Sequence, residues 1–179
     1  TIQRDLYNDL GMAFVAVLFL IYAMLVAWYG SFLIPIIVML PIPLIFIGVI
    51  PAHALLGKAL NGPGTIGVIA LAGIVLRNSI LLVDFARSHI ADGMTVKEAV
   101  LKACSLRARP IIITALAIIL GESVLYFDQM LQGLGITMPS GTFISTLLTL
   151  GIVPVAYYQL ASLQQKRALK KASNLPEGI

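Results

Sequence analysis

Charged residues are scarce in this 179-residue sequence. Asp, Glu, Lys and Arg together make up 11% of the chain, whereas hydrophobic residues make up 59%. Soluble domains carry about 25% charged residues. A soluble protein of this length could not bury so much apolar surface, so the composition excludes an ordinary soluble domain and predicts an integral membrane protein.

Cysteine and histidine are scarce as well. The single cysteine, Cys104, allows no disulfide within the chain. The two histidines, His53 and His89, have no second histidine or cysteine nearby at the spacing of metal ligands. There is no nucleophile elbow, phosphate loop or zinc motif, and the few carboxylates form no acid–base pair. We therefore expect neither enzymatic activity nor a metal or other cofactor.

Hydrophobic residues are abundant and occur in long runs. Each is long enough to cross a bilayer as a helix, and they predict an all-α integral membrane fold of about five transmembrane helices. The second run contains four prolines, which remove backbone donors and kink helices, so we expect it to be bent. The predicted spans are residues 10–30, 32–57, 64–86, 110–127 and 134–163.

A polar connector, residues 87–109, separates the third and fourth runs. Thr95 and Glu98 have the spacing of a helix-capping box, and apolar residues then recur on one face. This pattern predicts a short amphipathic helix over residues 96–106 that lies along the membrane surface. Pro110 occupies a favoured first position and predicts the start of the fourth span.

Basic residues cluster in the connector and in the C-terminal tail, and this clustering gives the orientation. The positive-inside rule places both clusters on the cytoplasmic side, with the N-terminus outside. The clusters indicate topology, so the net charge of +4 does not predict nucleic-acid binding. We expect a bundle over residues 1–163 and a basic cytoplasmic tail over 164–179 that is disordered at its end. The basic residues are Arg87, Lys97, Lys102, Arg107 and Arg109 in the connector, and Lys166, Arg167, Lys170 and Lys171 in the tail.

Arg77 is the unexpected residue, because it lies near the middle of the third span. A charged side chain at the bilayer centre costs at least about 2.5 to 3.5 kcal/mol and marks a functional position by default. Small residues near its face, Gly67, Ala70 and Gly73, would let another helix approach closely. Gly141, Ser145 and Thr149 form a second stripe of this kind; all these positions predict helix–helix contacts.

Glu122 is the other intramembrane charge, near the outer end of the fourth span. It is either a proton-linked acid or an interfacial carboxylate. Asp84, Arg87 and Asp128 end spans and are interpreted as solvated caps, and His53 as a satisfied polar residue rather than a ligand.

Several segments in order carry a resemblance to a known family: IALAGIVLRNSILLVDFAR, a basic loop, LRARPIIITALAIILGESVLYFD and STLLTLGIVPVAYY. Together they resemble the C-terminal membrane half of resistance–nodulation–division (RND) exporters of the acriflavine-resistance, multidrug-efflux type. The resemblance implies the last five spans of a twelve-helix domain in a bacterial inner membrane. It also implies a proton-driven efflux transporter that assembles as a trimer with a periplasmic adaptor and an outer-membrane channel.

The family's proton relay implies roles for particular residues. A basic residue on the antepenultimate helix matches Arg77, and an arginine and a threonine on the penultimate helix match Arg107 and Thr114. The two aspartates that they serve lie on a helix of the first half, which is absent from this sequence. Asn78 follows Arg77 and is either a relay member or an interhelical hydrogen bonder. For each arginine a purely structural role is the alternative to a relay role. Arg77 would then be an ion-pair partner that holds helices together, and Arg107 would be an anchor at the cytoplasmic surface.

The sequence leaves two functional hypotheses open, and a third possibility is a degenerate remnant without a function. The chain begins at Thr1 with no recognisable signal peptide, and no in-chain carboxylate matches Arg77 in depth. We therefore expect a membrane segment of a larger permease that is inactive alone, driven by the proton-motive force. The alternative is a stand-alone membrane protein that assembles with, or regulates, a complete transporter.

Overall fold

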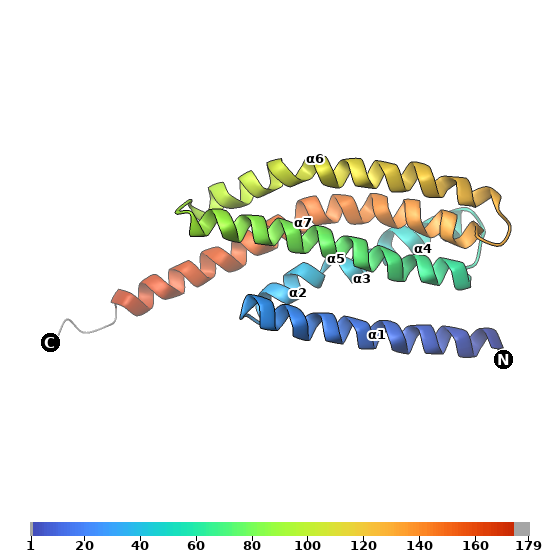
Figure 1. The fold of residues 1–179 in the computed structure, drawn as a ribbon, viewed down its shortest axis with the longest axis horizontal. Helices are drawn as coiled ribbons and strands as arrows, with labels where there is room; N and C mark the ends of the chain where they lie inside the picture. The colour runs from blue at the N-terminus through green and yellow to red at the C-terminus, as the bar shows by residue number, and fades with distance from the viewer. Residues whose placement is uncertain (1, 174–179) are drawn as a thin grey trace.

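The computed structural model describes residues 2–173, and these residues form helices without a strand (Figure 1). Five helical segments are long and apolar enough to cross a membrane, so the predicted all-α membrane bundle is confirmed. The elements are α1 (Ile2–Tyr29), α2 (Leu33–Met39), α3 (Pro41–Leu44), α4 (Phe46–Leu55), α5 (Gly62–Ala91), α6 (Val96–Ser123), the 3-10 helix η1 (Val124–Phe127) and α7 (Gln132–Ser173).

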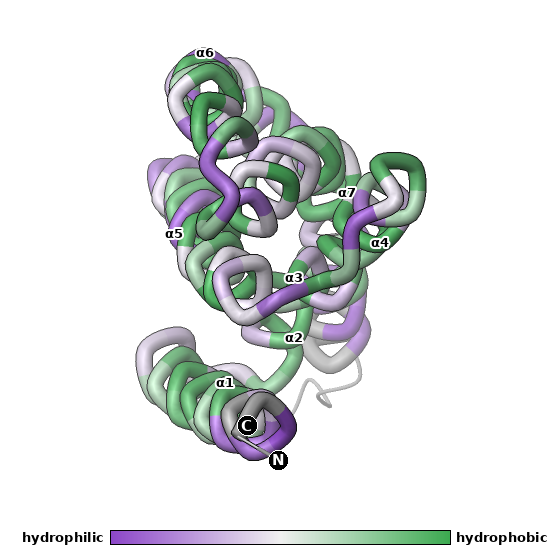
Figure 2. Tube along the Cα trace, turned by 90° about the vertical axis from the view of Figure 1, so that its right-hand side faces the viewer, coloured by the Kyte–Doolittle hydropathy of each residue, from purple (hydrophilic) through white to green (hydrophobic). Residues whose placement is uncertain are grey.

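Helices α5 and α7 form the centre of the bundle and make its most extensive contact. Helix α6 packs on one side of this pair, and α2, α3 and α4 pack on α7 from another side. Figure 2 looks along the bundle and shows α1 set apart at the edge opposite α6. Most of the outer surface of α1 is therefore apolar and uncovered, as expected for a helix that faces lipid or another membrane helix.

The second span is divided into α2, α3 and α4, as its prolines predict. Pro41 has no N–H to donate, and the Leu40 N–H bonds the Ile37 carbonyl at 3.3 Å in place of a regular α-helical partner. The path nevertheless stays helical, because φ and ψ at Leu40 and Ile45 lie in the α region. Pro41 and Ile45 are buried, so the break lies against protein.

The predicted surface helix over residues 96–106 is not a separate element. Residues 96–123 form one continuous helix, α6, that contains Pro110, and so Pro110 does not begin the fourth span. The capping box is present, because Thr95 and Glu98 satisfy each other's backbone N–H groups. The apolar face that was expected to lie on lipid is instead buried in the bundle: Val96, Ala99, Val100 and Ala103.

The ends of the other helices also differ from the predicted bounds. Helix α5 continues to Ala91 instead of stopping at residue 86, and the polar lead-in before residue 10 belongs to α1. Helix α7 runs through residue 163 to Ser173 without a break. The expected disorder at the end of the tail falls on residues 174–179, which lie outside the described residues. The division into bundle and tail stays a prediction.

The connections alternate between the two ends of the bundle (Figure 1). The α1–α2 turn, the α5–α6 loop and the C-terminal part of α7 lie at one end, where both basic clusters are found. We call this the basic end. The α4–α5 and α6–α7 connections lie at the other end, beside the start of α1. The loop order required by the predicted topology is therefore present in the fold.

Glycine allows α7 to approach its neighbours closely. A Cβ atom on Gly48 of α4 would lie 2.8 Å from Cβ of Ile144 and 2.9 Å from the Ser140 carbonyl oxygen. A Cβ on Gly141 would overlap the buried side chain of Leu71 in α5. Ser145 and Thr149 continue this stripe and are buried too, so the predicted contact stripe on this helix is confirmed.

We expect Gly48→Ala to destabilise the protein by about 1 to 3 kcal/mol, because the added methyl group meets backbone and cannot be accommodated without a helix shift. Gly151→Ala is the matched control, since nothing lies within 4 Å of its Cβ position. That substitution should be neutral or stabilise by up to about 1 kcal/mol through helix propensity. Unfolding in detergent measures both, and equal changes for the two variants would contradict the packing described here.

Candidate functional site: a polar cleft between α5 and α6

Arg77 lies in the middle of α5, about 21 to 23 Å along the helix from each end. Its side chain is exposed on the surface of this chain. Among the residues that the structure describes, no hydrogen bond or ion pair involves its guanidinium. The structure therefore presents an open positive charge at the middle of a 30-residue candidate membrane-spanning helix, which agrees with the position expected from the sequence.

A cleft of about 290 Å³ begins at Arg77 and runs between α5 and α6. It brings together all four residues that the sequence singled out for a proton relay. The lining positions follow the pattern i, i+1, i+4 on α5 and i, i+3, i+4, i+7 on α6, so each helix contributes one face. The lining residues are Arg77, Asn78 and Leu81 from α5, and Arg107, Pro110, Ile111 and Thr114 from α6.

Arg107 is held at the end of this cleft that is nearer the basic end. Its guanidinium carbon lies 3.8 Å from the centroid of the Phe85 ring, a cation–π contact between α6 and α5. The Nε atom is buried and has no hydrogen-bond partner among the described residues. Arg107 is thus a half-buried charge that is held against an aromatic ring. A membrane-surface anchor would need only a solvated side chain, so this environment favours a role in the cleft.

Thr114 lies two helical turns from Arg107 on the same face of α6. Its hydroxyl donates to the Pro110 carbonyl at 2.9 Å. This bond fixes the hydroxyl donor within the helix and leaves oxygen lone pairs available to accept a hydrogen bond in the cleft. Since α5 and α6 are antiparallel, Phe85 pairs with Arg107, and Arg77 lies towards Thr114. The cleft therefore connects the mid-depth of the bundle with its basic end.

A second, apolar hollow of about 370 Å³ lies on the other side of Arg77, between α1 and α5. Arg77 and Leu81 line both hollows, so the arginine stands on the ridge between them.

The small residues near Arg77, which were expected to let another helix approach closely, differ in what they contact. Gly67 packs against Leu134 and Thr137 of α7, whereas Gly73 has nothing within 4 Å of its Cβ position. The predicted close helix contact is present at Gly67 and absent at Gly73 within the described chain.

Other candidate residues lie outside the cleft. Glu122 is half-buried in the last turn of α6, eight residues and about 12 Å beyond Thr114, away from the basic end. It does not line the cleft that contains Arg77. His53 is buried, and its Nδ1 lies 3.1 Å from the Val49 carbonyl oxygen of the same helix. No group of three possible metal-binding side chains is found in the described part of the chain.

Sequence reasoning missed Phe85, the ring that holds Arg107. A phenylalanine in an apolar span carries no signal that separates a cation platform from a lipid-facing side chain. Its position two turns after Arg77 could have suggested the same helix face, but the partner on α6 is set only by the register of the two helices. Ser79 is fully buried with no hydrogen-bond partner among the described residues, and it does not line the cleft.

Comparison with known proteins gives the family. Residues 2–161 match the AcrB/AcrD/AcrF family. The chain is 37% identical over 169 residues to the swarming motility protein SwrC of Bacillus subtilis, covering 91% of this chain and 16% of that protein. It is 36% identical over 161 residues to the multidrug resistance protein MdtC of Erwinia amylovora, covering 87% of this chain and 15% of that protein.

The MdtC protein of Serratia proteamaculans is 35% identical over 164 residues, which cover 88% of this chain and 16% of that protein. The chain thus spans about a sixth of the length of these curated relatives. The match extends through α5, α6 and most of α7, and so it includes the whole polar cleft. By its sequence and its helical membrane architecture, the chain belongs to the AcrB/AcrD/AcrF family of the RND superfamily.

Proposed function

We propose that this chain acts as a membrane segment of a proton-driven RND-type multidrug efflux transporter and contributes part of its proton relay. The observation that carries the proposal is the cleft that joins Arg77 and Asn78 of α5 to Arg107 and Thr114 of α6. The names of two relatives, both multidrug resistance proteins, support the efflux assignment.

Arg77 acts in this proposal as a fixed positive charge. A guanidinium keeps its proton in proteins, so Arg77 does not carry the transported proton itself. It attracts a facing carboxylate, and a proton that binds to that carboxylate weakens the attraction to Arg77. Proton binding would then release a helix contact, and proton loss would restore it. The carboxylates belong to a helix of the rest of the permease.

The other cleft residues would bring water and protons to Arg77. The Asn78 amide and the Thr114 hydroxyl can each orient a water molecule, and a cleft of about 290 Å³ has room for several. Arg107, held on Phe85, stands between this space and the basic end. Glu122 lies outside the path and is assigned no part in it.

The proposal includes the surroundings of the chain. The segment is inactive alone and works with the first half and porter domains of a permease, as a homotrimer with a periplasmic adaptor and an outer-membrane channel. It lies in the bacterial inner membrane with its C-terminus in the cytoplasm, because the positive-inside rule places the basic end there. It needs no cofactor besides the proton-motive force and has no enzymatic activity.

Arg77→Met should abolish proton-coupled drug export while leaving membrane insertion intact, because it removes the charge and keeps the apolar stem. Export is measured in cells that lack other efflux pumps and express the native gene product. Arg77→Lys should retain part of the activity because the positive charge remains. Arg109→Gln is the control, since this exposed arginine does not line the cleft. Unimpaired export by Arg77→Met would remove the relay role.

The proposed orientation has its own test in a Cys104→Ala background. Gln129→Cys, in the exposed α6–α7 connection, should react with a membrane-impermeant maleimide added to spheroplasts. Lys166→Cys, exposed on α7 at the basic end, should react only after the membrane is opened. The reverse pattern of labelling would show that the basic end faces outwards and would overturn the assigned topology.

A further inference from the structure

A second polar pocket lies at the basic end, apart from the cleft that contains Arg77. It has a volume of about 350 Å³ and lies where the end of α5, the start of α6 and the last part of α7 meet. None of its lining residues belongs to the cleft. The residues that line it are Arg87, Ile90, Ala91, Met94, Val96, Tyr157, Ala161, Gln164 and Gln165.

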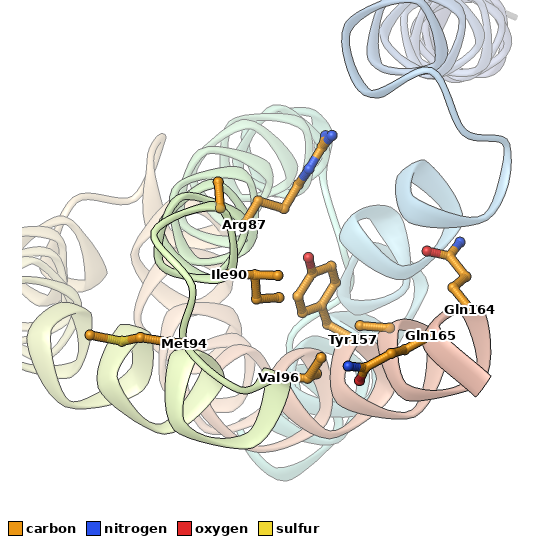
Figure 3. A pocket seen from close by; sticks show the side chains of 9 residues that line it. Arg87, Ile90, Met94, Val96, Tyr157, Gln164 and Gln165 are labelled. Carbon is orange, nitrogen blue, oxygen red and sulfur yellow. The ribbon is translucent and has the colours of Figure 1, made fainter. Parts of the chain in front are cut away.

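Side chains with hydrogen-bond donors line this pocket from two helices, α5 and α7. Figure 3 shows the Tyr157 hydroxyl directed between α5 and α7, with the Arg87 head group beyond it and the amides of Gln164 and Gln165 pointing in different directions. Tyr157 is only 4% exposed, so its hydroxyl is held in place by the packed core. No carboxylate lines the pocket. A guanidinium, a hydroxyl and two amides suit an anion with several acceptor oxygens.

Arg87 is held in a fixed position by an aromatic ring. Its guanidinium carbon lies 5.1 Å from the centroid of the Tyr29 ring at the end of α1. The Asp84 carboxylate lies near the Tyr29 hydroxyl and also acts electrostatically on Tyr157. Among the described residues no salt bridge involves Arg87, so its N–H donors are not consumed by a carboxylate. Lys166 and Arg167 follow the two glutamines on α7 and add positive charge at this end.

The pocket also has an apolar side, formed by Ile90, Met94, Val96 and Ala161. The candidate membrane-spanning stretches of α5 and α7 end at Ala91 and Arg167. The pocket lies next to these ends, and we therefore place it at the membrane–water interface. A ligand there would meet polar donors and an apolar wall together. Phospholipids have this combination, with a phosphate group joined to glycerol and acyl chains.

From these features we infer that the pocket binds the phosphate-bearing headgroup of an anionic phospholipid. The phosphate accepts from Arg87 and Tyr157, the glutamine amides bind the remaining headgroup oxygens, and the upper acyl region lies against the apolar wall. Basic pockets between membrane helices on the cytoplasmic side recognise lipid headgroups in this way. Since the lipid would bridge α5 and α7, it would tie together the two central helices at the end where α1 also meets α5.

The inference rests on the membrane-spanning bundle and does not depend on the proton relay. The test uses the purified native gene product in detergent, titrated with phosphatidylglycerol or with phosphatidylcholine of the same chains. The rise in melting temperature with lipid concentration gives the apparent affinity, because a ligand that binds only the folded state stabilises it. Inorganic phosphate in a third titration separates the lipid from free phosphate.

Arg87→Gln should weaken phosphatidylglycerol binding about tenfold or more, the effect of losing one charge-assisted hydrogen bond. Tyr157→Phe removes a neutral hydrogen bond and should weaken it about threefold. Arg109→Gln removes the same charge outside the pocket and should leave the affinity unchanged. Melting temperatures without lipid show whether each variant is folded. If Arg87→Gln does not fold, the loss of phosphatidylglycerol affinity in Tyr157→Phe is the test.

Three results would overturn the inference. Equal binding of phosphatidylcholine and phosphatidylglycerol would show that the negative headgroup is not recognised. Equal losses in Arg87→Gln and Arg109→Gln would show a diffuse charge effect in place of a pocket. Stabilisation by inorganic phosphate at the concentration that suffices for phosphatidylglycerol would assign the pocket to a free anion. Loss of drug export without any of these results would bear on the relay proposal alone.

Discussion

The close approach of α7 to α5 and α4 is the contact on which the rest of this structure depends. Gly48 and Gly141 remove the side chains that would hold these helices apart, and buried Thr149 continues the seam. Packing of small residues is a principal source of helix association in a membrane, where lipid tails are as apolar as leucine. With α7 in place, α6 is set against both α5 and α7, and the register of α5 and α6 is fixed.

That register creates the polar cleft. It places Phe85 under Arg107 and brings Thr114 into the same hollow as Arg77, although these residues come from two helices joined by a loop at the basic end. Arg77 meanwhile stays exposed on the ridge beside α1. A charge in this position is costly in lipid, which is why its retention favours a task outside the packing of this chain.

The sequence was informative where a signal is local. Apolar length predicted five spans, prolines predicted the broken second span, and the Thr95–Glu98 spacing predicted the start of a helix. Local signals misplaced the boundary at Pro110, because the apolar face of residues 96–103 could not show whether lipid or protein would cover it. Arg77 was found from its depth in an apolar span, whereas Arg107 and Thr114 came from the family resemblance. That these residues line one cleft depended on the helix register. Phe85 carried no signal at all.

The most direct test of this account is whether water enters the cleft, which the reactivity of an introduced thiol measures. In a Cys104→Ala background, Thr114→Cys should react with a small anionic methanethiosulfonate added from the cytoplasmic side, because thiolates form in water and Arg77 attracts the reagent. Leu116→Cys, two residues on and outside the cleft, should remain unreactive. Adding Arg77→Met should slow the reaction of Thr114→Cys. A Thr114→Cys thiol that reacts no faster than Leu116→Cys would contradict a hydrated path to Arg77.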